Sequence, residues 1–260
     1  MIFDSHLHVT LVGEKNTEGA VQKLLDSMKL VGVERSCVMP EPVSSLYFSK
    51  DDMTGQAAIL DDIGQKHKDI LYPLLWINPT LPFDFTKELI DRYIINGNII
   101  GVKLWIEINA RNKRLEPLAE YLEKHDIPVL FHSWYKTVSK YGAESDPSDI
   151  AVLSRKFPKL RILMAHLTGC RLRGVQDIKD CPNVWIDTSG GQPEDGYLEY
   201  AIAELGPNRV LFGSDYGGRD IATQLGRIFS VDMSDEDREK ILSLNALEFY
   251  RKGERVNRHV

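Results

Sequence analysis

Two histidines lie two residues apart at the start of the chain, in the stretch MIFDSHLHV, where Asp4, His6 and His8 occupy alternate positions. Successive side chains of a strand point to opposite faces, so His6 and His8 are expected on the same face. Two neutral imidazoles held side by side can share one cation. This pair therefore raises the hypothesis of a metal site close to the N-terminus.

Two further histidines and an aspartate follow other apolar runs: His132 in VLFHSW, His166 in LMAHLTG and Asp215 in LFGSDYG. Burying several imidazoles together is costly, because each has a polar nitrogen to satisfy. A divalent ion removes that cost, and nitrogen and oxygen donors suit Zn²⁺. The other three histidines lie among charged or polar residues and are interpreted as solvated: His67, His125 and His259.

The elements that must position these residues are short β-rich runs alternating with amphipathic segments. Eight runs rich in Ile, Val, Leu and aromatic residues are predicted to be strands: Ile2–His8, Arg35–Met39, Ile70–Ile77, Ile99–Trp105, Pro128–Trp134, Leu160–Leu167, Val184–Thr188 and Arg209–Phe212. Nine segments with helical spacing of apolar residues are predicted to be helices: Thr17–Leu30, Asp52–Lys66, Phe83–Ile95, Leu115–Lys124, Asp146–Lys156, Arg171–Lys179, Glu194–Glu204, Asp220–Phe229 and Asp235–Lys252. The polar stretch 134–147 is the longest insertion and a candidate mobile lid.

Eight strand–helix repeats predict an α/β fold, either a (β/α)₈ TIM barrel with an additional C-terminal helix or an open doubly wound sheet. The chain contains neither G-x-G-x-x-G nor G-x-x-x-x-G-K-[ST], the glycine patterns that an open nucleotide-binding sheet favours. The barrel is therefore the preferred prediction. Its strand ends converge on one mouth, where the four histidines and Asp215 would meet.

Length and composition limit the functional classes. The 260 residues, 43% of them hydrophobic, predict one barrel domain over residues 1–260, because α/β barrels of this size are often undivided. A formal charge of −6 argues against nucleic acid or an anionic membrane as a partner, and we expect a small-molecule substrate instead. Neither a signal peptide nor a long apolar run is present, and Cys37, Cys170 and Cys181 read as reduced thiols, so a cytoplasmic protein is expected.

The chain also resembles a known protein family. DSHLH, GVKLW, PVLFHSW, ILMAHLTG, WIDTSG, VLFGSDYG and NALEFY, in this order, resemble the amidohydrolase superfamily, most closely its amidohydrolase-related (amidohydrolase 2) branch. The resemblance implies a divalent metal, often zinc, held by His6, His8, His132 and Asp215, with His166 in catalysis or behind the ligands. Members hydrolyse amides, esters or lactones, and a subset removes CO₂ from aromatic acids. A homodimer is a further expectation at superfamily level.

Lys103 in GVKLW and Asp187 in WIDTSG are each open to two interpretations. In binuclear relatives a lysine at this strand carries a carbamate that bridges two metals, so two ions are the alternative. We favour one ion, with Lys103 as a charge or hydrogen-bond donor in the pocket. Asp187 is either a turn residue or a partner that fixes the tautomer of an imidazole.

Three tryptophans and two arginines follow strand ends and are candidate substrate contacts. Trp76, Trp105 and Trp134 would either pack in the core or form walls for a flat or apolar substrate. Arg171 and Arg173 in GCRLRG would either be solvated or hold a substrate carboxylate with their planar guanidinium groups.

The expected chemistry is hydrolysis of an amide, ester or lactone bond by a metal-activated water, since Zn²⁺ lowers the pKa of bound water to about 7. Asp215 would accept the water proton, and His166 would hold the carbonyl oxygen or orient the water. The alternative is a decarboxylase, in which Asp215 or His166 supplies a proton to the ring carbon. A barrel that binds a ligand without turnover is a third, less favoured hypothesis.

Overall fold

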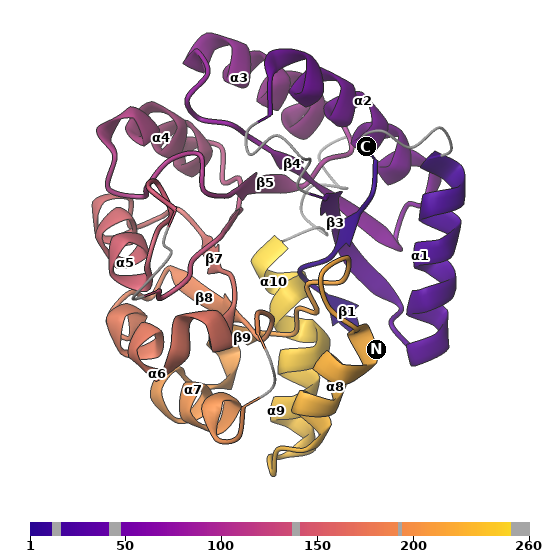
Figure 1. The fold of residues 1–260 in the computed structure, drawn as a ribbon, viewed down its shortest axis with the longest axis vertical. Helices are drawn as coiled ribbons and strands as arrows, with labels where there is room; N and C mark the ends of the chain where they lie inside the picture. Colours follow the sequence, from indigo (N-terminus) through magenta and orange to yellow (C-terminus); the bar gives the residue numbers. More distant parts are fainter. Residues whose placement is uncertain (12–16, 42–47, 137–140, 192–193, 251–260) are drawn as a thin grey trace.

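The computed structural model describes residues 1–11, 17–41, 48–136, 141–191 and 194–250 of the chain. Strands and helices alternate along it, with the strands gathered at the centre (Figure 1). The strands are β1 (Phe3–Asp4), β2 (His8–Val9), β3 (Arg35–Pro40), β4 (Leu71–Trp76), β5 (Gly101–Leu104), β6 (Val129–Phe131), β7 (Ile162–Met164), β8 (Val184–Asp187) and β9 (Val210–Leu211).

All strand pairs are parallel, and neighbours follow in the order β1-β3-β4-β5-β6-β7-β8-β9, with β2 also paired to β3. The last strand returns to the first through backbone hydrogen bonds: Ser5 N donates to Phe212 O at 2.9 Å, and Asp215 N donates to His6 O at 2.7 Å. The sheet is thus curled round on itself, and the predicted (β/α)₈ barrel is confirmed. This closure brings the first and last strands into contact.

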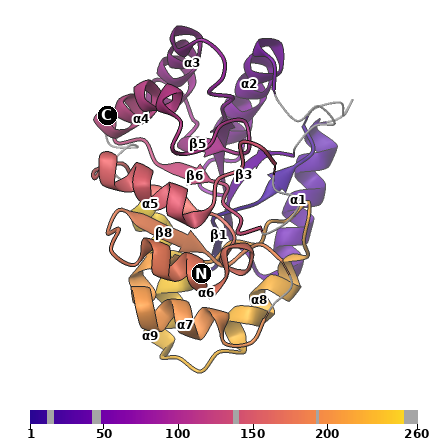
Figure 2. The ribbon, with the colours of Figure 1, turned by 60° about the vertical axis from the view of Figure 1, so that its left-hand side comes forward.

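The described residues form ten α-helices, which surround the strands as an outer layer (Figures 1 and 2) except for α10, drawn near the middle of the ring of strands in Figure 1. They are α1 (Thr17–Val31), α2 (Lys50–Lys66), α3 (Phe83–Ile90), α4 (Glu116–Lys124), α5 (Pro147–Lys156), α6 (Leu167–Ile178), α7 (Tyr197–Leu205), α8 (Ile221–Phe229), α9 (Asp235–Glu239) and α10 (Asn245–Tyr250). Four short helical turns add to them: η1 (Asp91–Ile95), η2 (Lys113–Leu115), η3 (Pro207–Arg209) and η4 (Lys240–Leu244). No helix in this part of the chain combines the length and apolar character that a membrane span requires.

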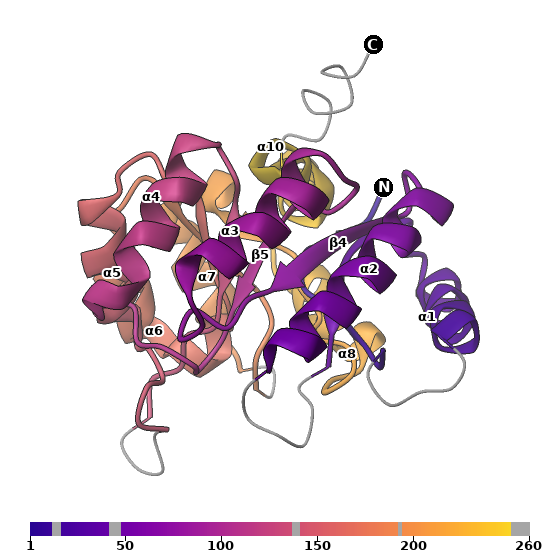
Figure 3. The ribbon, with the colours of Figure 1, turned by 90° about the horizontal axis from the view of Figure 1, so that it is seen from above.

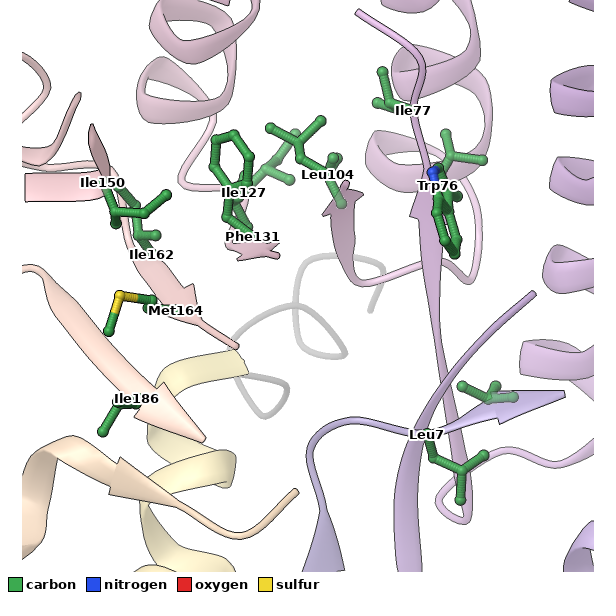
Figure 4. Close-up of a cluster of buried hydrophobic side chains, with 14 of the residues drawn as sticks. Leu7, Trp76, Ile77, Leu104, Ile127, Phe131, Ile150, Ile162, Met164 and Ile186 are labelled. Atoms are coloured by element: carbon green, nitrogen blue, oxygen red, sulfur yellow. The ribbon is translucent and has the colours of Figure 1, made fainter. Parts of the chain in front are cut away.

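Apolar side chains form two buried layers. The outer layer lies between sheet and helices, where residues such as Phe131, Ile150 and Ile162 pack together (Figure 4). The inner layer fills the barrel, and there the Phe3 ring stacks between Tyr72 and Tyr250. Because Tyr250 belongs to α10 and Phe3 begins β1, α10 closes the N-terminal end of the barrel, as Figure 3 also shows. The opposite end is left for the loops that follow the strands.

The first predicted strand, Ile2–His8, is broken into β1 and β2. The Asp4 carboxylate accepts the backbone N–H of His6 at 3.1 Å, and this local bond interrupts the regular ladder. Phe3 accordingly packs in the inner layer, whereas Leu7 packs in the outer one. The His6 and His8 side chains still lie on the same face of the strand, as predicted, but the break between β1 and β2 determines which face this is.

Other strand and helix boundaries differ from the predicted ones at the carboxyl ends of the strands. The strands predicted over Pro128–Trp134 and Leu160–Leu167 end at Phe131 and Met164, so His132 and His166 lie just beyond regular structure. The helix predicted to start at Arg171 begins at Leu167, directly after His166, and is interrupted at Arg171 (φ 60°, ψ −179°). The predicted C-terminal helix is split into α9, η4 and α10, and its last two residues lie outside the described part of the chain.

Candidate metal centre

The two histidines of the first strand are held from behind by acceptors. His6 Nδ1 lies 2.8 Å from Asp187 Oδ2, and His8 Nδ1 lies 2.8 Å from the Pro40 carbonyl oxygen. A carboxylate and a carbonyl oxygen only accept, so both Nδ1 atoms carry the proton. Both Nε2 atoms face inwards, 3.3 Å from each other. Asp187 Oδ1 also accepts the backbone N–H of Ser189 at 3.0 Å, so Asp187 is both a turn residue and the partner that fixes the His6 tautomer, and its two interpretations hold together.

The histidines after β6 and β7 likewise have one ring nitrogen hydrogen-bonded to a partner behind the ring. Ser189 Oγ donates to Asp187 Oδ1 at 2.5 Å, and it can therefore accept from His166 Nδ1 at 2.9 Å. His132 Nε2 donates to Glu144 Oε1 at 2.9 Å. The remaining nitrogens, His166 Nε2 and His132 Nδ1, lie 3.1 Å apart. Each of the four rings therefore turns one nitrogen toward the interior.

Asp215, which follows the last strand, adds a carboxylate to the four histidines. Its Oδ1 lies 3.5 Å from His6 Nε2 and 3.4 Å from His8 Nε2. Burial alone would raise the pKa of Asp215, but the hydrogen bond with His8 and the nearby imidazoles hold it below its ordinary value. Asp215 (φ 58°) and His166 (φ 76°) both adopt the left-handed backbone region. Non-glycine residues rarely occupy this region, and they do so most often at functional sites.

The donor spacing fits one divalent ion. Two atoms bound to the same Zn²⁺ at about 2.1 Å lie roughly 3.0–3.5 Å apart, and the gaps from His6 to His8 and Asp215 are 3.3 and 3.5 Å. The ligand atoms of His6, His166 and Asp215 all lie within 4.8 Å of one another. Burial lowers the pKa of His6, of His132 (to about 4) and of His166, so these rings are neutral at pH 7. Neutral nitrogens that face one another without a proton between them match the donor set of a metal.

The centre opens into a pocket of about 370 Å³ at the carboxyl ends of the strands. All three candidate tryptophans line it, and the rings of Trp76 and Trp105 meet edge to face at 5.3 Å. Trp134 lies against Gly169, where an added Cβ would be only 2.7 Å from the indole. Trp76 is fully buried within the pocket wall, whereas Trp105 and Trp134 are half-buried, so packing in the core and lining the pocket occur together.

Lys103 also lines this pocket, with its Nζ 3.4 Å from His6 Nε2 and a side chain that is 1% exposed. Among the described residues, no carboxylate lies within 4.0 Å of this nitrogen. Burial lowers the pKa of Lys103 to about 8, so the amine is still mostly charged at pH 7. The carboxylates of Asp215, Asp187 and Glu107 lie farther away and offset the cost of burying this charge only in part, so an anionic ligand would be its nearest counter-ion.

The two candidate arginines are not brought to the pocket. Arg171 is exposed at the interruption of α6, and Arg173 donates to the Tyr135 hydroxyl and lies over that ring at 4.7 Å. Because α6 begins four residues earlier than predicted, both arginines lie about one turn farther from the mouth. Part of the candidate lid, residues 137–140, lies outside the described chain.

Sequence reasoning missed two residues of the site, Glu144 and Ser189, and a buried glutamate outside the pocket lining, Glu107. Glu144 and Ser189 hold imidazoles in place, and Glu107 Oε1 accepts the indole N–H of Trp76 at 2.8 Å. Burial raises the pKa of Glu107 to about 7. Ser189 could have been found from its place two residues after Asp187, whereas Glu144 has no distinguishing spacing within its polar loop.

Fold and site together define a class of protein, a (β/α)₈ barrel enzyme with a histidine and carboxylate centre at the carboxyl ends of its strands. The family model described as Amidohydrolase matches residues 3–252. The chain belongs to this family and is an enzyme. No curated protein sequence matches it.

Solved structures with the same fold include several decarboxylases. A 2,6-dihydroxybenzoate decarboxylase from Rhizobium has a TM-score of 0.77 at 16% identity, covering 97% of this chain and 100% of that one. A 5-carboxyvanillate decarboxylase from Sphingomonas paucimobilis has a TM-score of 0.75 at 16% identity, covering 96% and 98%. A dihydroxybenzoic acid decarboxylase from Polaromonas, with bound manganese and 2-nitroresorcinol, has a TM-score of 0.74 at 15% identity, covering 97% and 98%.

Proposed function

We propose that this enzyme is a metal-dependent decarboxylase of a small aromatic acid. The single observation that carries the proposal is Lys103, a buried cation without a carboxylate partner in the described residues, which faces a pocket walled by three indoles. Aromatic walls suit a flat ring, and the ammonium group suits an anionic substituent. The decarboxylases with the same fold act on such acids.

The residues of the chain have distinct tasks in this reaction. Lys103 holds an anionic group of the substrate, and Trp76, Trp105 and Trp134 exclude water from its ring. The carbon–carbon bond to the carboxylate breaks, CO₂ leaves, and a proton takes its place on the ring carbon. His166 and Asp215 face the pocket, and either group would first take up a proton from solvent or from a substrate hydroxyl group and then deliver it to the ring carbon.

A single divalent ion, Zn²⁺ or Mn²⁺, would be held by His6, His8, His132 and Asp215, with His166 beside them. When bound, such an ion polarises substrate oxygen atoms as a Lewis acid. The distances among His6, His8 and Asp215 support three of these ligands. His166 joins His6 and Asp215 in a group whose donor atoms lie within 4.8 Å of one another, and His132 is 3.1 Å from His166. The manganese named in one similar structure leaves the choice between the two metals to experiment.

Hydrolysis of an amide, ester or lactone is the second candidate. It is favoured by the lowered pKa of Asp215, because an ionised carboxylate is suited to accept a proton from water. In this reading Lys103 would anchor a carboxylate that does not react.

Isotope incorporation separates the two reactions. Metal-loaded enzyme is incubated with hydroxybenzoic acids and, separately, with aromatic lactones and amides, in D₂O and in H₂¹⁸O. Decarboxylation is expected to release CO₂ and to place one deuterium on the ring. Product that carries ¹⁸O from lactones or amides, with no CO₂ released from any acid, would overturn the proposal and establish the hydrolase.

A further inference from the structure

Glu144 is a buried carboxylate that lies directly behind one of the inward-facing rings. Its side chain is 1% exposed, and its Oε1 lies 2.9 Å from both His132 Nε2 and Lys136 Nζ. His132 is the histidine after β6, whose strand ends one residue earlier at Phe131. The His132 N–H still donates to the Leu104 carbonyl oxygen at 2.9 Å, which fixes the backbone, whereas the direction of the ring depends on its side-chain partners.

The bond to Glu144 decides which nitrogen of His132 is available. A carboxylate only accepts, so His132 Nε2 must carry the proton of the neutral ring. The lone pair is then on Nδ1, which lies 3.1 Å from His166 Nε2 at the centre. With the opposite tautomer, Nε2 and the carboxylate would repel each other, and Nδ1 would direct a proton toward the centre.

The backbone around Glu144 is itself anchored. The Asn109 side chain donates to the Glu144 carbonyl oxygen at 3.2 Å. The next residue, Ser145, accepts the Ala110 N–H on its hydroxyl at 2.9 Å and the Trp134 N–H on its carbonyl at 3.1 Å. Asp146 then caps α5 with a capping box. Glu144 is thus fixed between the segment that follows β5 and the start of α5.

We propose that Glu144 is a positioning residue that selects the tautomer and direction of His132, so that Nδ1 is the metal-binding nitrogen. This inference rests on the proposed metal centre. Carboxylates behind metal-bound histidines commonly fix the ring and make it a stronger ligand, and their loss costs 10- to 100-fold in metal affinity. Glu144 does this from a loop that also carries Trp134, so one segment shapes both the pocket wall and the centre.

The test compares Glu144→Gln and Glu144→Leu with Glu107→Gln as a matched control. Glu107 is a second buried glutamate near the pocket, but its carboxylate accepts the indole N–H of Trp76 and does not contact an imidazole in the described residues. Dissociation constants for Mn²⁺ and Zn²⁺ are measured on the metal-free protein by competition with a chromophoric chelator. In parallel, ¹⁵N spectra of the metal-free wild type assign the tautomer of each histidine.

We expect the Nε2–H tautomer for His132 in the wild type. The metal dissociation constant should rise about 10-fold in Glu144→Gln, about 100-fold in Glu144→Leu and less than twofold in the control. An Nδ1–H tautomer in the wild type, or wild-type affinity in both Glu144 variants, would overturn the inference. A wild type that binds neither ion would contradict the metal centre instead, so the two failures can be told apart. The wild-type spectrum decides the question even if a variant does not fold.

Discussion

Lys103 shows how a single residue can combine an unfavourable position with a function. Its ammonium group is buried beside His6, with no carboxylate within ion-pair distance among the described residues. Burying such a charge costs stability. If the charge binds an anionic substrate, its removal should weaken substrate binding while leaving stability level or raising it.

Lys103→Met tests this relationship. Loss of a charge-assisted hydrogen bond costs about 1.5–3 kcal/mol, so kcat/KM for an anionic substrate should fall roughly 10- to 150-fold. The melting temperature should stay level or rise, because a buried charge is replaced by an apolar side chain. Steady-state kinetics and thermal melts measure both effects. Inhibition by a neutral phenol should hardly change, and equal weakening of neutral and anionic inhibitors would contradict the assigned role.

Glu107 should make the stability of the protein depend on pH. Burial raises the pKa of Glu107 to about 7, above the ordinary value of 4.5, so the folded state binds more protons than the unfolded state between these values. Its favourable contribution is therefore complete below pH 4.5 and lost as pH rises to about 7. Glu107→Gln should be more stable than the wild type by on the order of 2 kcal/mol at pH 8, with little difference at pH 4.5. Urea unfolding across this range measures the gap, and a constant gap would contradict the prediction.

At the scale of elements, the break between β1 and β2 connects the two ends of the chain. Asp4 Oδ1 accepts the N–H of His6 at 3.1 Å and that of Ser214 at 2.9 Å. One carboxylate oxygen thus holds both the segment with the two histidines and the turn that carries Asp215. The break in the strand is a device for positioning ligands from both ends of the barrel.

Asp4→Ala should therefore lose about 2–4 kcal/mol of unfolding free energy, because two buried N–H groups lose their acceptor. Metal affinity should fall with it, since the relative position of His6 and Asp215 is no longer held. Asp4→Asn is the control, because its amide oxygen can accept both bonds, and it should lose less than half as much. Urea titration and chelator competition provide the measurements. Equal losses in the two variants would show that charge, rather than the two hydrogen bonds, matters.

The start of α6 sets the position of a pocket wall through Gly169. An alanine there would place its Cβ 2.7 Å from the Trp134 ring, so the indole must move. We expect Gly169→Ala to raise KM roughly 5- to 10-fold, a loss of about 1 kcal/mol in binding. Gly226→Ala in α8 is the matched control, because nothing lies within 4 Å of its added Cβ. A KM that changes equally in both variants would argue against contact between Trp134 and the substrate.

At the scale of the whole molecule, the centre joins residues of the first barrel strand, which is split into β1 and β2, with residues that follow β6, β7 and β9. A metal held by all of them should stabilise the fold by binding only the folded state, by about 2.7 kcal/mol at a concentration 100 times its dissociation constant. Chelation should abolish turnover and lower the melting temperature, and Mn²⁺ or Zn²⁺ should restore both. The variant His8→Ala should show a smaller shift on addition of metal. An unchanged melting curve for the wild type after chelation and reloading would contradict the metal centre.

Much of the fold could be predicted because its signals are local. Buried parallel strands are continuous apolar runs, and helices repeat their apolar residues every three or four positions. Eight such alternations already indicate the barrel, and the polar residues His6, His132, His166 and Asp215 mark the ends of its strands. Strand ends were less predictable, because after β7 a side chain takes over from the ladder: the Asp187 carboxylate, rather than a backbone carbonyl, accepts the N–H of His166 at 2.9 Å.

The sequence by itself therefore determined the architecture, the group of histidines with Asp215, and the presence of three indoles near them. Tertiary structure alone decided that Glu144 holds His132, that Lys103 has no carboxylate partner in the described chain, and that Arg171 and Arg173 lie away from the pocket. The reason is physical: periodicity is set by neighbours along the chain. A hydrogen bond or an uncompensated charge depends on distances between residues that only the closed barrel brings together.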